Sequence, residues 1–146
     1  MQKIYDNSTK DKELSYYVDI LLDKLGFRKN TLGTKYLRDL ILFIYFNNVY
    51  DIFIDKACIN FLKSKNIMHI SKKNFINRLD YAIKNVDIDK FQKNFYSIFH
   101  IEYDIYYLSV KNIVILLVNK IKIWKTTNLC KFNDLPFYIK EGLMVN

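Results

Sequence analysis

Turn-forming residues are scarce in this chain, and that scarcity limits what it can fold into. Three glycines and one proline occur in 146 residues, whereas folds built from many short strands need such residues at their turns. Apolar residues instead recur at every third or fourth position over long stretches, which is the period of an amphipathic α-helix. The sequence therefore predicts an all-α fold, a compact bundle of about six helices.

Six segments carry the helical period. In chain order they are 12–25, 34–47, 50–64, 71–85, 88–99 and 109–123. Gly26 is expected to end the first helix, because glycine readily adopts the left-handed conformation of a C-cap. Ser71 is expected to begin the fourth, because its hydroxyl can accept a hydrogen bond from an amide of the first turn. A further short helix is expected near 133–141.

Each predicted helix has an apolar stripe that is expected to face the core. In the first two helices the stripes are Leu14, Tyr17, Val18, Leu21 and Leu25, and then Leu37, Leu40, Ile41 and Ile44. In 71–85 the expected core residues are Phe75, Leu79, Ala82 and Ile83, with Val86 just beyond. The opposite face of that helix carries Lys73, Asn77, Asp80 and Lys84, and of these Lys73, Asn77 and Lys84 are expected to be exposed.

The length and composition fit one folded domain. Hydrophobic residues make up 51% of the chain and aromatic residues 16%, which argues against intrinsic disorder. We expect a flexible N-terminal tail at 1–11, a helical domain at 12–123 and a C-terminal extension of unassigned role at 124–146.

The net charge of +8 favours an anionic partner, either nucleic acid or a membrane surface. A second explanation stays open, because a chain rich in Ile, Lys, Asn, Tyr and Phe also reflects AT-rich coding. The apolar runs at 40–46 and 113–118 are too short to span a bilayer. We therefore expect a cytoplasmic protein with no membrane partner, associated with the nucleoid when bound to DNA.

Catalytic and metal-binding motifs are missing from the sequence. Cys58 and Cys130 lie far apart without the spacing of metal ligands, and are expected to be reduced thiols. His69 and His100 have no carboxylate or cysteine at a useful spacing. No glycine-rich phosphate loop, HExxH or GxSxG occurs. We expect no enzyme activity, no cofactor and no metal site.

The third and fourth predicted helices form a helix-turn-helix candidate, because a short polar connection joins them. In that motif the second helix enters the major groove of DNA, and residues of its N-terminal half contact base edges. On pattern alone the signal is weak, since any helical bundle contains such pairs.

A resemblance strengthens this interpretation. The stretch GFRKNTLGTKYLRDLI at 26–41 resembles part of the C-terminal DNA-binding (effector) domain of the stage-zero sporulation master response regulator. Two glycines have the same separation as in that family, and a Tyr-Leu-Arg-acidic run follows them with an apolar pair. These positions are Gly26, Gly33, Tyr36, Leu37, Arg38, Asp39 and Ile41. Tyr81-Ala82-Ile83 and the apolar spacing of 108–123, with Lys120 near its end, also match. The likeness covers about residues 15–123.

The resemblance implies an all-helical domain of about six helices with a helix-turn-helix, double-stranded DNA as the partner, and 71–85 as the recognition helix. Members of the family usually carry an N-terminal receiver domain. We expect this chain to be a divergent stand-alone copy without one. The family contacts DNA as tandem copies, so a tandem dimer on DNA is expected. The unmatched segment 124–146 is a candidate for contact between the copies.

Departures from the family pattern suggest a changed target sequence. Asn74, Asn77 and Asp80 stand where the family has arginines, and Ile76 replaces a glutamate. Because arginine pairs with guanine and asparagine with adenine, the preference is expected to move towards A·T-rich sites. The candidate base-contacting residues are Lys73, Asn74, Ile76, Asn77 and Asp80. The candidate phosphate-contacting residues are Ser71, Lys72, Arg78 and Lys84.

The lost arginines also leave a second function open. A degenerate copy of the domain would act by contact with a full-length regulator or with RNA polymerase, rather than by reading DNA. The outer residues of 71–86 would then be merely solvated.

Overall fold

The computed structural model describes residues 8–47, 54–67 and 69–130, with side chains described from Lys12 to Thr126 within those ranges. The described chain contains six α-helices, one short 3₁₀ helix and no strand. The elements are α1 Ser8–Lys24, α2 Leu32–Phe46, α3 Ile54–Ser64, α4 Lys72–Lys84, α5 Ile88–Phe99, η2 Ile105–Tyr107 and α6 Val110–Cys130. The predicted all-α class with six helices is confirmed.

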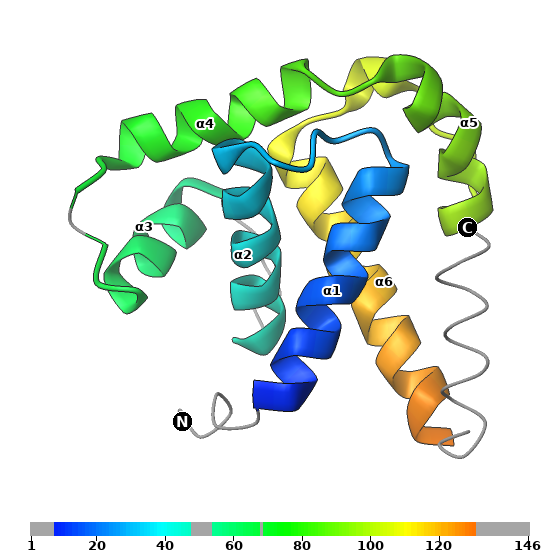
Figure 1. Ribbon diagram of the computed structural model, residues 1–146, viewed down its shortest axis with the longest axis horizontal. Coiled ribbons are helices and arrows are strands. Elements are labelled where there is room, and N and C mark those ends of the chain that lie inside the picture. The colour runs from blue at the N-terminus through cyan, green and yellow to red at the C-terminus, as the bar shows by residue number, and fades with distance from the viewer. Residues whose placement is uncertain (1–7, 48–53, 68, 131–146) are drawn as a thin grey trace.

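Helix α2 is the centre of the bundle, and it packs against α1, α3, α4 and α6. Figure 1 shows α4 lying along the upper edge of the molecule, with α2 and α3 below it and α5 beyond its C-terminal end. None of the described helices is long and apolar enough to cross a membrane.

The predicted core stripes are buried almost without exception. All five residues of the first predicted stripe, the last of which lies just after α1, and all four of the second are below 6% exposure. Phe75 and Leu79 of α4 are fully buried, and Ala82 and Val86 nearly so. Ile83 was expected in the core but is half-buried, because it lies at the margin of the contact between α4 and its neighbours.

Several helix boundaries differ from those predicted. Residues 8–11, expected in the N-terminal tail, form the first turns of α1, and residues 124–130 continue α6 rather than starting an extension. Helix α2 begins at Leu32, two residues early, because the Thr31 hydroxyl accepts a hydrogen bond from the Thr34 amide. Residues 50–53 of the expected third helix and the expected helix at 133–141 lie outside the described residues.

Gly26 ends α1 as predicted, and the structure shows why glycine is needed there. Its φ of +90° lies in the left-handed region, and an added Cβ would lie 2.6 Å from the Asp87 carbonyl oxygen. The Asp87 amide donates to the Gly26 carbonyl oxygen at 2.9 Å. The Arg28 guanidinium donates to the Asn85 carbonyl oxygen at 3.1 Å. The turn after α1 therefore holds the C-terminal end of α4.

Gly33 lies in the first turn of α2, where that helix touches α4. A Cβ at this position would collide with the Arg78 carbonyl oxygen and lie 3.2 Å from the Ala82 Cβ. The two backbones therefore approach more closely than any larger residue would allow.

The Gly33→Ala variant is expected to lose about 1–3 kcal/mol of folding stability, because the added methyl group forces α2 and α4 apart. Chemical denaturation followed by circular dichroism measures this loss. Lys35→Ala replaces an exposed side chain of the same helix, and as a control it should change stability by less than about 0.5 kcal/mol. Equal stabilities for the two variants would contradict the close contact.

Two polar contacts join distant parts of the bundle. Arg38 of α2 donates to Asp19 of α1 at 3.1 Å and to the neighbouring Asp39 at 2.9 Å. The Lys120 amine of α6 donates to the Ile98 carbonyl oxygen at 2.7 Å, near the C-terminal end of α5, and burial lowers the pKa of this amine. A cation is favourable at a helix C-terminus.

Candidate nucleic-acid interface

Helix α4 has capping groups at both ends. The Ser71 side chain accepts a hydrogen bond from the Asn74 amide at 3.1 Å, as predicted for an N-cap. Asn85 follows the last turn, and its side-chain amide donates to the Tyr81 carbonyl oxygen at 2.8 Å. Lys84 lies in the last turn, where a positive charge stabilises the helix dipole.

The inner face of α4 is held by aromatic contacts. The Phe75 ring lies 4.8 Å from that of Tyr36 in α2 and 5.5 Å from that of Phe61 in α3. Phe75 is fully buried. One aromatic residue therefore fixes α4 against both of the helices beneath it.

The outer face of α4 carries polar and charged side chains. Lys73, Asn77, Asp80 and Lys84 are all exposed, as the sequence predicted for Lys73, Asn77 and Lys84. Within the described parts of the chain, none of these four side chains makes a hydrogen bond or an ion pair. Their spacing of three or four residues puts them on one strip along the helix. The strip is therefore available for an external ligand.

One flank of α4 opens into a shallow groove of about 750 Å³. Asn74, Asn77 and Arg78 form its α4 side. Leu32 and Tyr36 of α2, the His69–Ile70 connector and Tyr81 complete the lining. The structure thus brings together three of the predicted DNA-contacting residues with an apolar wall that the sequence analysis did not include.

The other flank of α4 faces α3. The pKa of the Cys58 thiol of α3 is raised to about 12, chiefly by burial. The Asp55 and Asp80 carboxylates contribute to this rise, and Lys72 opposes it. Lys72 and Asp80 therefore lie near α3. Ile76 falls between them on the same flank and is half-buried, packed against the core. A packing role accounts for much of the Ile76 side chain, although it was predicted to contact a base.

The predicted residues lie on three adjoining parts of α4, and Asn77 and Asp80 each belong to two of them. The exposed strip contains Lys73, Asn77, Asp80 and Lys84, the groove flank contains Asn74, Asn77 and Arg78, and the α3 flank contains Lys72, Ile76 and Asp80. Ser71 is exposed, but its hydroxyl already accepts the capping hydrogen bond.

Leu32 and Tyr81 are functional candidates that the sequence analysis missed. Their exposed fractions are 42% and 64%, large values for such apolar side chains, and both line the groove. Tyr81 had a signal in the sequence, since it lies off the apolar stripe of its helix. Leu32 had none, because its place beside α4 depends on the contact between Gly33 and the α4 backbone.

Helices α3 and α4 are consecutive and in contact. Residues 65–71 join them, a longer connection than the three or four residues of the usual motif. Asn66 has a φ of 55°, and the Ile67 amide donates to the Leu62 carbonyl oxygen at 3.0 Å, so a left-handed turn ends α3. The helix-turn-helix assignment stays a prediction.

The remaining polar candidates from the sequence lie apart from one another. His69 is exposed in the connector before α4, and His100 caps the C-terminus of α5. Asp87 caps the N-terminus of α5 by accepting from the Lys90 amide at 3.2 Å. In the portions of the chain with described positions, no three His, Cys, Asp or Glu side chains gather as metal ligands.

Comparisons with known proteins return nothing for this chain: no family model, no curated protein and no solved structure matches it.

Proposed function

We propose that the chain is a sequence-specific DNA-binding transcription regulator that inserts α4 into the major groove of A·T-rich sites. The single observation that carries the proposal is the contrast between the two faces of α4. Its inner face is buried through Phe75, and its outer strip of polar and charged side chains has no partner within the described residues. A helix that presents such a strip along one edge of a domain suits groove binding.

Charge and the local chemistry of the strip support DNA as the ligand. The chain has a net charge of +8, and Lys73 and Lys84 lie at opposite ends of the strip with Arg78 and Lys72 on its flanks. Cations at these positions suit contacts to phosphates on both sides of a groove. Asn77 lies between the two lysines, and an asparagine side chain pairs with the N6 and N7 edge of adenine.

Membership in the sporulation-regulator effector family remains part of this proposal. Its support is physical: Gly26, Gly33, Tyr36 and Arg38, which carry the resemblance, each make a contact that holds α4 or α1 in place. The resembling residues therefore explain how α4 is positioned. Of the departing residues, Asn77 and Asp80 lie on its exposed strip, Asn74 lies on the groove flank, and Ile76 is half-buried on the α3 flank.

Selection of bound DNA from a random duplex pool tests the proposal. The expected result is an enriched A·T-rich motif, bound with an affinity that falls steeply as salt increases. An absence of any salt-dependent binding would favour the second candidate function, contact with a full-length regulator or RNA polymerase. Asp80 on the outer strip favours that candidate, because a carboxylate there opposes phosphate.

The Asn77→Ala variant is expected to relax sequence preference at one position by about 1–3 kcal/mol, the value of one bidentate base contact. Non-specific binding should stay nearly intact, because alanine removes no charge. Repeating the selection with this variant measures the change. Asn119→Ala, on exposed α6 surface, is the matched control and should select the wild-type motif. If Asn77→Ala selects that motif too, Asn77 does not read a base.

A further inference from the structure

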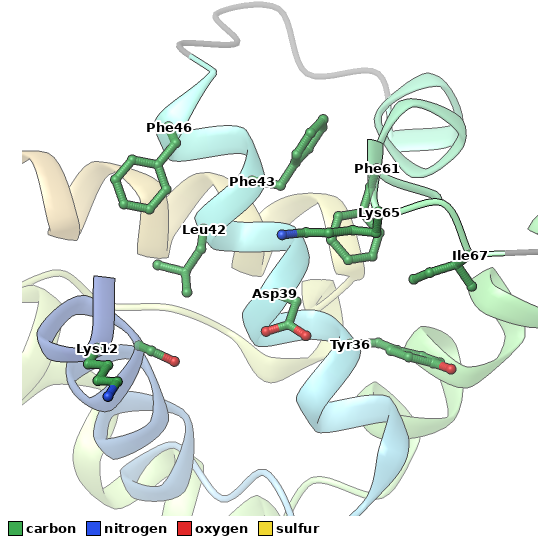
Figure 2. Close-up of a pocket in the computed structure, with 10 residues that line it drawn as sticks. Lys12, Tyr36, Asp39, Leu42, Phe43, Phe46, Phe61, Lys65 and Ile67 are labelled. Carbon is green, nitrogen blue, oxygen red and sulfur yellow. The ribbon is translucent and has the colours of Figure 1, made fainter. Parts of the chain in front are cut away.

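Tyr36 and Phe61, whose rings contact Phe75, also line a second groove, of about 520 Å³. We call it the aromatic groove and define its apolar walls by Tyr36, Leu42, Phe43, Phe46, Phe61 and Ile67. Figure 2 shows these side chains coming from α2, from α3 and from the connector after α3, with Lys12 of α1 at the other side. A concave apolar surface of this size suits a few side chains of a bound peptide segment.

The walls of the aromatic groove are incompletely covered by the rest of the domain. Leu42, Phe43 and Phe46 are partly buried against the core but retain exposed surface beside Ile67. Phe43 and Phe61 meet edge to face at 5.6 Å, so the wall is ordered packing and not a loose surface. The exposed parts of these side chains give the groove an apolar lining.

The chain itself contains an apolar segment outside the described residues. Residues 131–146 read KFNDLPFYIKEGLMVN and include Phe132, Leu135, Phe137, Tyr138 and Ile139. Aromatic and aliphatic residues at this density gain free energy when they leave water, at about 25 cal/mol for each Å² of apolar surface buried. Packing of the segment on an apolar surface would therefore lower its free energy.

Its point of departure lies within reach of the aromatic groove. Trp124 of α6 stacks on Tyr17 of α1 with ring centroids 4.8 Å apart, which fixes the last turns of α6 beside α1. Figure 1 shows the end of α6 and the start of α1 on the same side of the molecule. Lys12 and Ser15 of α1 line the groove. Sixteen residues follow Cys130, and an extended chain covers about 3.3 Å per residue, so the segment is long enough to pass α1.

Charge at the groove edge matches the segment. Asp39 lies in the groove but is already paired with Arg38 at 2.9 Å. Two exposed lysines, Lys12 and Lys65, also line the groove. Asp134 directly precedes Leu135, Pro136 and Phe137. A carboxylate beside that apolar run can pair with Lys12 while the run enters the groove.

We propose that residues 131–146 dock in the aromatic groove of the same chain, with Phe137 and its apolar neighbours against Leu42, Phe43 and Ile67. The docked segment would press on Tyr36 and Phe61, and through them on Phe75 of α4. It would thereby brace the helix that we propose to bind DNA, a consequence that rests on the proposed function. The docking itself does not depend on DNA.

Paramagnetic broadening in the full chain tests the docking without DNA. A nitroxide is attached to the Lys140→Cys variant in a Cys130→Ser background. Cys58 should not react, because it is buried and its thiol has a pKa of about 12. We expect the methyl signals of Leu42 and Ile67 to broaden, whereas those of Ile88, on the first turn of α5, keep their intensity. Unchanged signals at Leu42 and Ile67 would overturn the proposal.

A mixed sample separates this chain from a second copy. Nitroxide-labelled chains without isotope are mixed with isotope-labelled chains that carry no nitroxide. Docking within one chain predicts no broadening in the mixture. Broadening at Leu42 and Ile67 in the mixture would overturn the proposal and make the segment an element of contact between copies.

A variant pair then tests the consequence for DNA. Phe137→Ala should lower affinity for every DNA sequence by a similar factor and leave the selected motif unchanged. The matched variant Tyr106→Ala removes an aromatic side chain from an 82% exposed site on η2 and should leave affinity unchanged. If docking is observed but Phe137→Ala binds DNA as the wild type does, the segment docks without bracing α4.

Discussion

Replacing Phe75 with alanine is expected to lower the free energy of unfolding by about 3–5 kcal/mol. The side chain is fully buried; its ring stacks on that of Phe61 and makes a tilted contact with that of Tyr36. Its removal leaves a cavity where three helices meet and deletes two aromatic contacts. Urea denaturation, followed by circular dichroism at 222 nm, measures the loss as a lower midpoint at unchanged slope.

Two variants calibrate this result. Phe75→Leu keeps most of the apolar volume and should cost less than Phe75→Ala, because the residual cavity is smaller. Tyr81→Ala removes an aromatic side chain of the same helix that is 64% exposed, so it should change stability by less than about 0.5 kcal/mol. A loss below about 1 kcal/mol for Phe75→Ala would mean that Phe75 does not anchor α4 in solution.

The effect on DNA binding separates anchoring from contact. If α4 is the binding helix, Phe75→Ala should weaken binding to all sequences although Phe75 touches no DNA. Tyr81→Ala should leave folding intact and alter only contacts made in the groove flank. A loss of stability in Phe75→Ala alone, with a change of sequence preference in Tyr81→Ala alone, would distinguish the inner face of α4 from its exposed side.

The sequence predicted helix bounds well where an N-cap residue directly precedes an apolar stripe of helical period. The α5 helix has the predicted bounds, because Asp87 caps a stripe formed by Phe91, Phe95 and Ile98. Helix α4 differs from the predicted 71–85 by one residue at each end, and Ser71 caps the stripe formed by Phe75 and Leu79. In both helices the information is local, since the cap lies within four residues of the first buried side chain.

The sequence did not predict features that depend on contacts between distant segments. The close approach of the α4 backbone to Gly33, in the first turn of α2, joins segments far apart in the chain. Ile76 was assigned to DNA, yet its burial depends on the approach of α3. The aromatic groove joins residues from α1, α2, α3 and the following connector. No periodic pattern within one helix contains such information.

The outer strip of α4 was predictable as exposed but not as functional. A periodicity of 3.6 residues predicts that Lys73, Asn77 and Lys84 point away from the core whether or not they bind anything. Exposure alone therefore does not distinguish a DNA-reading face from a solvated one. The two kinds of face are distinguished by comparing variants that lose the same number of charges at different positions, because only loss from a DNA-reading face weakens binding.

The double variant Lys73→Ala/Lys84→Ala is expected to weaken binding to every DNA sequence. Each lost phosphate contact should reduce the slope of log affinity against log salt by about 0.9, so the pair should reduce it by about 1.8. The motif selected from a random pool should stay A·T-rich, because phosphate contacts position the protein without specifying bases. Binding titrations at several salt concentrations measure the slope.

A matched pair decides whether position or total charge matters. Lys93→Ala/Lys111→Ala removes two positive charges from exposed sites on α5 and α6, so both double variants have the same net charge. If α4 contacts the phosphates, the α4 pair should flatten the slope and the α5–α6 pair should leave it nearly unchanged. Equal flattening by both pairs would mean that DNA attracts the basic chain as a whole, and that α4 is not its recognition helix. A steep slope that only the α4 pair reduces is the result that the exposed strip predicts, because Lys73 and Lys84 are exposed and have no described partner inside the protein.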